Sequence, residues 1–277
     1  MSFEQICKDI KSLKIQGATN VAKAGVQAFK IKHDERSIKK LLSLRPTEPA
    51  LRNAINFSLK DTKKNPDIAL KHFEEAKKKI VEIGAREIPK DSVVFTHCHA
   101  STVTGILKKA FKTKKFEAYC TETRPMYQGR ITAKELASAK IPVTMFVDSA
   151  ARYALKNSDI MLLGADAVLS NGKVANKIGS ELFAEAAKKY GIPIFVCTDS
   201  WKFDPSTVKD YEEKLERREA KEVWPNPPKG VKISNIAFEL IAPELITGII
   251  SELGIYNPET FVVEVQKAYP WMFENAP

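Results

Sequence analysis

The 277 residues are enough for one large core or two smaller ones, and 44% hydrophobic with 28% charged residues is the composition of an ordinary globular protein. The formal net charge of +10 comes mainly from lysines spread over the expected helix faces, as in Lys/Glu-rich hyperthermophile proteins, so we expect no specific nucleic-acid partner. No apolar run approaches the roughly 20 residues of a membrane helix, and the first residues lack the apolar core of a secretory signal, so we expect a cytoplasmic protein with no membrane partner.

The first part of the chain has a helical pattern up to about residue 86. Ile6, Ile10 and Leu13 recur at turn spacing, and Gly17 interrupts the pattern before a second helix over residues 21–31. Further helices are expected over residues 37–44, 51–59 and 68–83, with a break at residues 45–47 because proline cannot continue a helix. We therefore predict a helical bundle domain over residues 1–88.

From about residue 88 the pattern changes from helical to strand-like. Short apolar runs alternate with helical segments, and they cover residues 92–96, 116–121, 143–147, 160–163 and 194–198. This alternation predicts an α/β fold, with a mainly parallel sheet and helices on both sides, in a second domain over residues 89–277. Residues 201–223 are a charged excursion and 224–228 a loop, and we expect a last strand over 245–252 and a helix or extended arm over 260–269.

The polar segment THCHAS, residues 96–101, follows the first predicted strand, and Ser101 or Thr102 can cap the next helix. A thiol at a helix N-terminus is favoured as the thiolate, so Cys98 is a candidate proton-transfer group or nucleophile. The alternative is a small buried residue at a strand end. We expect no metal site, because strand alternation would put the two histidines on one face and the cysteine on the other. The remaining cysteines form no C-x-x-C pair and are expected to be reduced, namely Cys7, Cys120 and Cys197.

Arg124 stands at the carboxyl end of the second predicted strand, where a guanidinium could hold a phosphate by a bidentate contact. After the third strand, Asp148 or Ser149 is expected to cap a helix. Neither glycine-rich nucleotide motif occurs, so a phosphate cradle would have to come from residues 16–19, which read QGAT, or from helix N-termini.

The buried apolar run of residues 160–163 ends in Gly164, Ala165 and Asp166, so a carboxylate stands where the strand should stop. A turn at residues 171–172 comes next, and then the polar pair Asn176 and Lys177. Ligands of open α/β sheets bind beyond the carboxyl ends of the strands, so these three side chains are expected to converge on a pocket. The alternative is that Asp166 caps a turn and Lys177 is solvated.

Six segments together resemble the initiation factor 2B regulatory-subunit family, which also contains ribose-1,5-bisphosphate isomerase and methylthioribose-1-phosphate isomerase. In chain order they are LRPTEPAL, THCHAST, TETRPMYQGR, VDSAARY, GADAVLSNGKVANKIGSE and ITGIISELG. The resemblance spans nearly the whole chain. It implies an N-terminal helical domain, a Rossmann-like C-terminal domain, no cofactor, and a homodimer or larger homo-oligomer that associates through the C-terminal domains.

The isomerases of this family use the Cys of the THC motif and the Asp of the GAD motif, which Cys98 and Asp166 match. The resemblance therefore implies that these two residues are catalytic in the conversion of an aldose 1-phosphate to a ketose phosphate. The expected ligand is a phosphorylated sugar or nucleotide, with ribose 1,5-bisphosphate as the best substrate. The substrate-binding residues that it implies are Gly17, Ala18, Arg45, Arg124, Asn176 and Lys177.

The chain departs from the isomerase pattern at one position. The isomerases have Arg-Gly-Ala at the first turn, where this chain has Gln16 followed by Gly17 and Ala18. Loss of a guanidinium from a phosphate site costs about 1.5–3 kcal/mol. The alternative function is therefore a non-catalytic initiation factor 2B alpha-type regulatory subunit that binds initiation factor 2 alpha.

Overall fold

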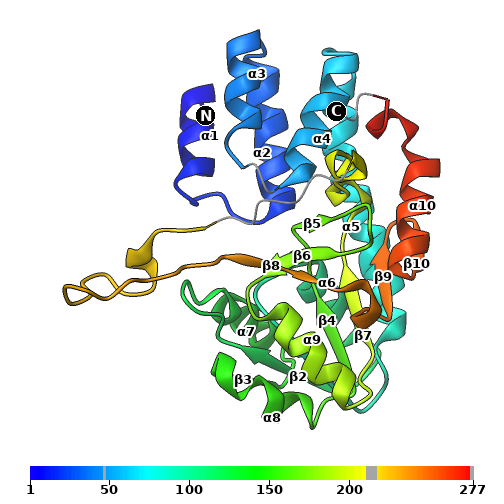
Figure 1. Ribbon diagram of the computed structural model, residues 1–277. Coiled ribbons are helices and arrows are strands. Elements are labelled where there is room, and N and C mark those ends of the chain that lie inside the picture. The colour runs from blue at the N-terminus through cyan, green and yellow to red at the C-terminus, as the bar shows by residue number, and fades with distance from the viewer. Residues whose placement is uncertain (46–47, 210–216, 275–277) are drawn as a thin grey trace.

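The computed structural model describes residues 1–45, 48–209 and 217–274. Within these ranges the helices α1 to α5 come first; α1 to α4 lie together at one end of the molecule, and α5 runs from there to the sheet (Figure 1). Their bounds are α1 Phe3–Lys11, α2 Ala18–Ile31, α3 Glu35–Leu42, α4 Pro49–Lys60 and α5 Asn65–Glu87. The expected helices are present, but the predicted break at Pro46 and Thr47 lies outside the described residues.

Local side-chain contacts fix where several of these helices begin and end. The Ser2 hydroxyl accepts the Gln5 amide at the start of α1, and the Asp34 carboxylate accepts the Ser37 amide at the start of α3. Helix α5 ends before Pro89. There the Lys114 ammonium donates to three carbonyl oxygens at 2.7–3.0 Å, those of Ala85, Arg86 and Ile88.

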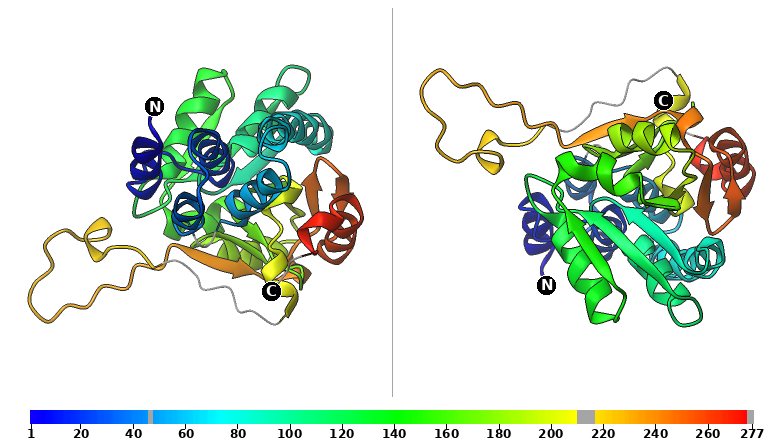
Figure 2. Two further views of the ribbon diagram at one scale, coloured as in Figure 1. Left: turned by 90° about the horizontal axis from the view of Figure 1, so that it is seen from above. Right: turned by 90° about the horizontal axis from the view of Figure 1, so that it is seen from below.

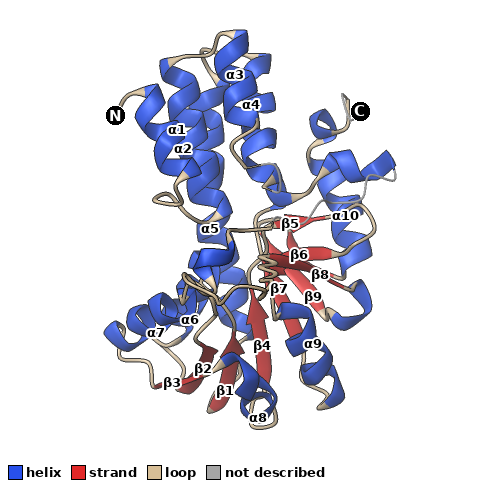
Figure 3. Cartoon of the chain, turned by 60° about the vertical axis from the view of Figure 1, so that its left-hand side comes forward, coloured by secondary structure: helices blue, strands red, loops and turns tan. Residues whose placement is uncertain are grey.

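The main sheet has seven strands among the described residues, in the order β10-β9-β7-β4-β1-β2-β3. They are β1 Ser92–Thr96, β2 Phe116–Thr121, β3 Val143–Phe146, β4 Ile160–Leu163, β7 Ile194–Cys197, β9 Gly248–Ser251 and β10 Gly254–Tyr256. Every pairing is parallel except that of β10 with β9. Flanking helices are α6 Ser101–Ala110, α7 Gln128–Ser138, α8 Ala151–Leu155, α9 Ser180–Lys189 and α10 Pro258–Ala268 (Figure 3). The predicted α/β fold class with a mainly parallel sheet is confirmed.

A second, antiparallel sheet was not expected. Strand β6 (Val174–Lys177) pairs with β5 (Ala167–Val168) on one side and with β8 (Phe238–Ile241) on the other. The register places Lys177 opposite Phe238, which lies 61 positions later in the sequence. This pairing has no local sequence signal, and it places the polar pair Asn176 and Lys177 in a strand, which was not predicted.

One buried apolar cluster includes residues from helices α2, α4 and α5 as well as from the sheet. Trp201 is part of it and packs against rings of α4 and α5 and against rings that follow α10. These rings are Phe57, His72, Phe73, Tyr269 and Trp271. The division into domains at residues 88 and 89 stays a prediction.

Residues 219–234 form a long loop that projects from the body (Figure 2). None of the described helices has both the length and the apolar character of a membrane span.

Candidate active site

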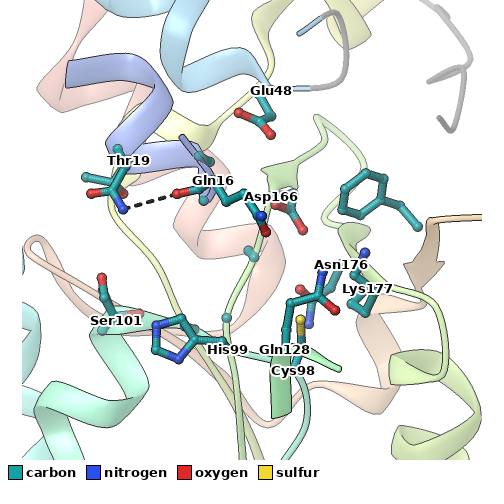
Figure 4. Close-up of a pocket in the computed structure, with 18 of the residues that line it drawn as sticks. Gln16, Thr19, Glu48, Cys98, His99, Ser101, Gln128, Asp166, Asn176 and Lys177 are labelled. Carbon is teal, nitrogen blue, oxygen red and sulfur yellow. Dashed lines mark hydrogen bonds between the residues drawn. The ribbon is translucent and has the colours of Figure 1, made fainter. Parts of the chain in front are cut away.

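A cavity of about 590 Å³ lies between the first turn of α2 and the carboxyl edge of the main sheet. Its walls come from five places: residues 16–20, the segment after β1, the segment after β4, strand β6, and charged side chains from elsewhere in the chain (Figure 4). Glycine at position 164 lets two of these walls approach. A Cβ there would lie only 2.6 Å from the Ala100 Cβ, so the strand ends that carry Cys98 and Asp166 can pack together.

Cys98 is held by hydrogen bonds of its backbone. Its φ of 64° is unusual for a residue other than glycine. The Cys98 amide donates to the Thr123 hydroxyl at 3.0 Å, and the Cys98 carbonyl accepts from the Thr132 hydroxyl at 2.8 Å. These contacts fix the backbone from behind, and the Cys98 side chain lines the cavity.

The two histidines beside Cys98 have structural partners. His97 is buried, and its Nε2 donates to the Ile178 carbonyl at 2.9 Å while its Nδ1 accepts from the Thr121 hydroxyl. Burial lowers the His97 pKa to about 4, so the ring is neutral at pH 7. The Thr132 hydroxyl gives its proton to the Cys98 carbonyl, so His99 Nδ1 must donate to that hydroxyl, at 3.1 Å. The described residues contain no group of three or more His, Cys, Asp or Glu side chains placed to hold a metal ion.

Burial raises the pKa of the Cys98 thiol to about 11, and the nearby Lys177 charge lowers it only in part. The protonated thiol is therefore the stable form at neutral pH, and the expected thiolate is wrong for this structure. The reason lies in the local geometry. Helix α6 begins at Ser101 with Ala100 as its cap, so Cys98 lies before the helix terminus, and desolvation outweighs the helix dipole.

Asp166 has the pKa direction that a buried carboxyl should have. Burial raises the Asp166 pKa, and the positive charges that oppose this effect are Lys202, Lys177, Arg45 and Arg218, in decreasing order. The Asp166 amide donates to the Ala175 carbonyl at 2.8 Å, so the second sheet fixes its backbone. The cavity thus combines a carboxyl that favours its protonated form with a group of surrounding cations.

Of the residues predicted to bind substrate, Gly17, Ala18, Arg45, Asn176 and Lys177 line the cavity. Arg45 is buried and forms an ion pair with Glu48 at 2.6 Å. The Asn176 amide donates to the Ser180 hydroxyl at 3.1 Å. The structure therefore brings together segments that are as much as 160 residues apart in the sequence.

Arg124 is not among the residues that line the cavity. Its guanidinium donates to the Tyr127 hydroxyl at 2.7 Å and to the Val223 carbonyl at 3.0 Å. Asp148 also differs from its expected role as a helix cap. Its carboxylate accepts the amides of Thr123 and Arg124 at 2.8 and 2.7 Å, so it orders the loop after β2 instead.

Sequence reasoning missed Lys202, Arg218, Glu48 and Gln128, which also line the cavity. Lys202 follows the carboxyl end of β7, and its ammonium donates to the Ala165 carbonyl at 2.7 Å. The rule that selected Asp166 after β4 would have selected Lys202 as well. Arg218 comes from the distant charged excursion, where no local pattern distinguishes it from solvated residues.

Comparisons with known proteins show what the whole chain is similar to. The model of the initiation factor 2 subunit family matches residues 11–258. A ribose 1,5-bisphosphate isomerase from Pyrococcus furiosus is 34% identical, over 98% of this chain and 95% of that protein. A methylthioribose-1-phosphate isomerase from Heliobacterium modesticaldum is 31% identical, over 91% of this chain and 87% of that protein. The solved structure of the translation initiation factor eIF-2B from Pyrococcus horikoshii OT3 has a TM-score of 0.85 at 29% identity, covering 94% of this chain and 98% of that one. The matches extend over both the helices and the sheet that form the cavity.

Proposed function

The chain belongs to the initiation factor 2 subunit family, and from this premise we propose that it is an isomerase of a sugar 1-phosphate. The best substrate is ribose 1,5-bisphosphate and the product is ribulose 1,5-bisphosphate. One observation carries the proposal: Cys98 and Asp166 line the same cavity, together with a group of cations (Figure 4). The isomerases named above are similar to this chain over more than nine tenths of its length.

The substrate explains why the site needs an acid. A phosphate on C1 prevents the sugar ring from opening spontaneously, so the bond between C1 and the ring oxygen must be broken by acid catalysis. Burial raises the pKa of Asp166, which favours the protonated carboxyl that a general acid requires. Asp166 gives its proton to the ring oxygen, the C1–O4 bond breaks, and C1 becomes electron-deficient.

The second stage moves a proton from C2 to C1. The Cys98 thiol first loses its proton to water, and the thiolate then takes the C2 proton to give an enol phosphate. The thiol returns this proton to C1, while the Asp166 carboxylate takes the proton of the C2 hydroxyl, so C2 becomes a ketone. Both side chains then regain their starting protonation states, and no atom is gained or lost. Lys177 lies close enough to lower the pKa of the Cys98 thiol, so its charge would favour the thiolate that takes the C2 proton.

The cations in the cavity suit a doubly phosphorylated ligand. Lys177, Lys202 and Arg218 would hold phosphate oxygens by charge-assisted hydrogen bonds. The first turn of α2 adds backbone amides at Gly17 and Ala18, because the first amides of a helix lack acceptors within the helix. Arg45 and Asn176 complete the proposed substrate contacts, whereas Arg124 has no direct contact in this proposal. Gln16 supplies no charge, so binding depends more strongly on the remaining cations.

Incubation of the purified protein with ribose 1,5-bisphosphate tests the proposal, with phosphorus NMR to detect ribulose 1,5-bisphosphate. We expect turnover by the wild type and by Cys7→Ala, because Cys7 is buried in an apolar cluster formed by helices α1 to α4 and does not line the cavity. The double variant Cys98→Ser/Asp166→Asn should be inactive. Full turnover by this double variant would refute the assignment of the two residues.

A second candidate is the non-catalytic regulatory subunit that binds initiation factor 2 alpha. The observation that favours it is the similarity of this chain to the translation initiation factor structure, at a TM-score of 0.85. Absence of turnover together with retention of initiation factor 2 alpha in a pull-down at physiological salt would support it. Physiological salt is needed because a chain of net charge +10 binds many acidic proteins at low ionic strength. The predicted homo-oligomer remains a prediction.

A further inference from the structure

The short segment that follows β7, residues 198–202, contacts several separate parts of the molecule. Asp199 accepts from the Thr19 hydroxyl on the first turn of α2 at 3.3 Å. The Trp201 carbonyl accepts from Asn53 of α4 at 2.8 Å. Three residues beyond Asp199, Lys202 enters the cavity beside Asp166. The segment therefore joins the helices α2 and α4 to the sheet at the edge of the proposed site.

We propose that Asp199 is a positioning residue, which holds Thr19 and thereby fixes the first turn of α2 as a wall of the cavity. Asp199 does not line the cavity, whereas residues 16–20 all do. The affinity for a sugar phosphate then depends on a side chain that does not touch the ligand. This inference rests on the proposed function, because it assigns the wall of that same site.

The first turn of α2 needs an external contact to stay in place. Gly17 begins it with a φ of +84°, and the bonds from Asn20 to the Gln16 carbonyl and from Val21 to the Gly17 carbonyl are internal to the turn. For the described part of the chain, the Thr19–Asp199 bond is the hydrogen bond that connects residues 16–20 to the end of β7. Its loss would remove this link between the wall and the end of β7.

The surroundings of Asp199 indicate that this carboxylate is not there for stability. Asp199 is 3% exposed, and its Oδ1 has no hydrogen-bond partner among the described residues. It lies beside a second acid, Glu252, which accepts from the Ser200 amide at 3.1 Å and from the Tyr269 hydroxyl at 3.3 Å. A buried carboxylate that is only partly hydrogen-bonded costs free energy. The hydrogen bond to Thr19 therefore explains the presence of Asp199 better than a contribution to stability does.

The test measures steady-state kinetics with ribose 1,5-bisphosphate for Thr19→Val, Thr19→Ser, Asp199→Ala and the double variant Thr19→Val/Asp199→Ala. We expect Thr19→Val and Asp199→Ala each to raise KM by about 3- to 10-fold, with kcat within about twofold of the wild type. Thr19→Ser keeps the hydroxyl and should restore KM to within about twofold. The double variant should be no worse than either single variant, because both remove the same bond. Additive effects, or an unchanged KM in Asp199→Ala, would overturn the proposal.

A binding measurement separates this inference from the proposed function. If the wild type shows no turnover, the proposed function fails, while calorimetric titration with ribose 5-phosphate still tests the wall. The same 3- to 10-fold loss is then expected in Kd for Thr19→Val, with rescue by Thr19→Ser, and an unchanged Kd refutes the positioning role. If Asp199→Ala does not fold, this Thr19 pair decides alone. Thr113→Val is the matched control with no change expected, because the Thr113 hydroxyl donates to the Ala110 carbonyl at the end of α6, and Thr113 does not line the cavity.

Discussion

The protonation state of Cys98 gives the most direct test of the proposed chemistry. Burial raises the pKa of this thiol to about 11, so about one molecule in 10⁴ carries the thiolate at pH 7. A thiol at its ordinary pKa of 9.0 would be ionised about 100 times more often. If the thiolate takes the C2 proton, kcat between pH 6 and pH 9 should rise about tenfold for each pH unit as long as Asp166 stays protonated, and level off where Asp166 ionises.

The assay is the rate of ribulose 1,5-bisphosphate formation at saturating substrate over that pH range, repeated in heavy water. Proton transfer through Cys98 should place deuterium on C1 of the product, because a thiol exchanges its proton with the solvent. Lys177→Met should move the rise in kcat to still higher pH, since the Lys177 charge lowers the Cys98 pKa. A product with no deuterium on C1 would refute the thiolate base and indicate a hydride shift from C2 to C1. Cys7→Ala is the control and should keep the wild-type profile.

Three further predictions concern stability and activity. Asp166→Asn should lower kcat by at least about 100-fold and raise the melting temperature at pH 7, because a carboxyl whose pKa is raised by burial loses stability as the pH rises through that pKa. The wild type should lose on the order of 3 kcal/mol of stability between pH 4.5 and pH 7, since burial raises the Glu252 pKa to about 7. Glu252→Gln should not show this loss, because the amide stays neutral. Lys114→Met should lower the free energy of unfolding by about 1–3 kcal/mol with kcat unchanged, because it leaves carbonyls at the end of α5 without their donor. Denaturant titration and calorimetry over pH 4–8 measure the three changes in stability, and the rate of ribulose 1,5-bisphosphate formation gives kcat.

Each of these predictions has an outcome that contradicts it. A lower melting temperature for Asp166→Asn at pH 7 would show that the carboxylate is stabilised by the surrounding cations more than burial destabilises it. Parallel pH–stability curves for the wild type and Glu252→Gln would exclude an acid that titrates near neutrality at this position. An unchanged unfolding free energy in Lys114→Met would mean that water replaces the lysine at the end of α5. Lys115→Met is its control, because Lys115 is exposed and its ammonium lies over the Phe111 ring.

The sequence predicted the strands β1, β2, β4 and β7 closely, because buried parallel strands are short apolar runs between helices. It also selected Cys98 and Asp166, because each directly follows such a run. It did not predict the second sheet. Strand β6 pairs with β8, which lies about 60 residues later, and a pairing at that distance has no signature in either segment. Lys202 was missed although it follows β7, because a charged residue in a charged segment has the same pattern as a solvated one.

The sequence alone determined the fold class, the family and the choice of Cys98 and Asp166 as candidates, because hydrophobic periodicity and motif order are properties of the linear chain. Only the tertiary structure decided how those groups are ionised and what surrounds them. Desolvation depends on every neighbour that replaces water, so the Cys98 thiol is protonated although its position before a helix suggested a thiolate. The same holds for the cations near Asp166, which come from distant segments, and for Asp199, whose contact with Thr19 joins residues 180 positions apart.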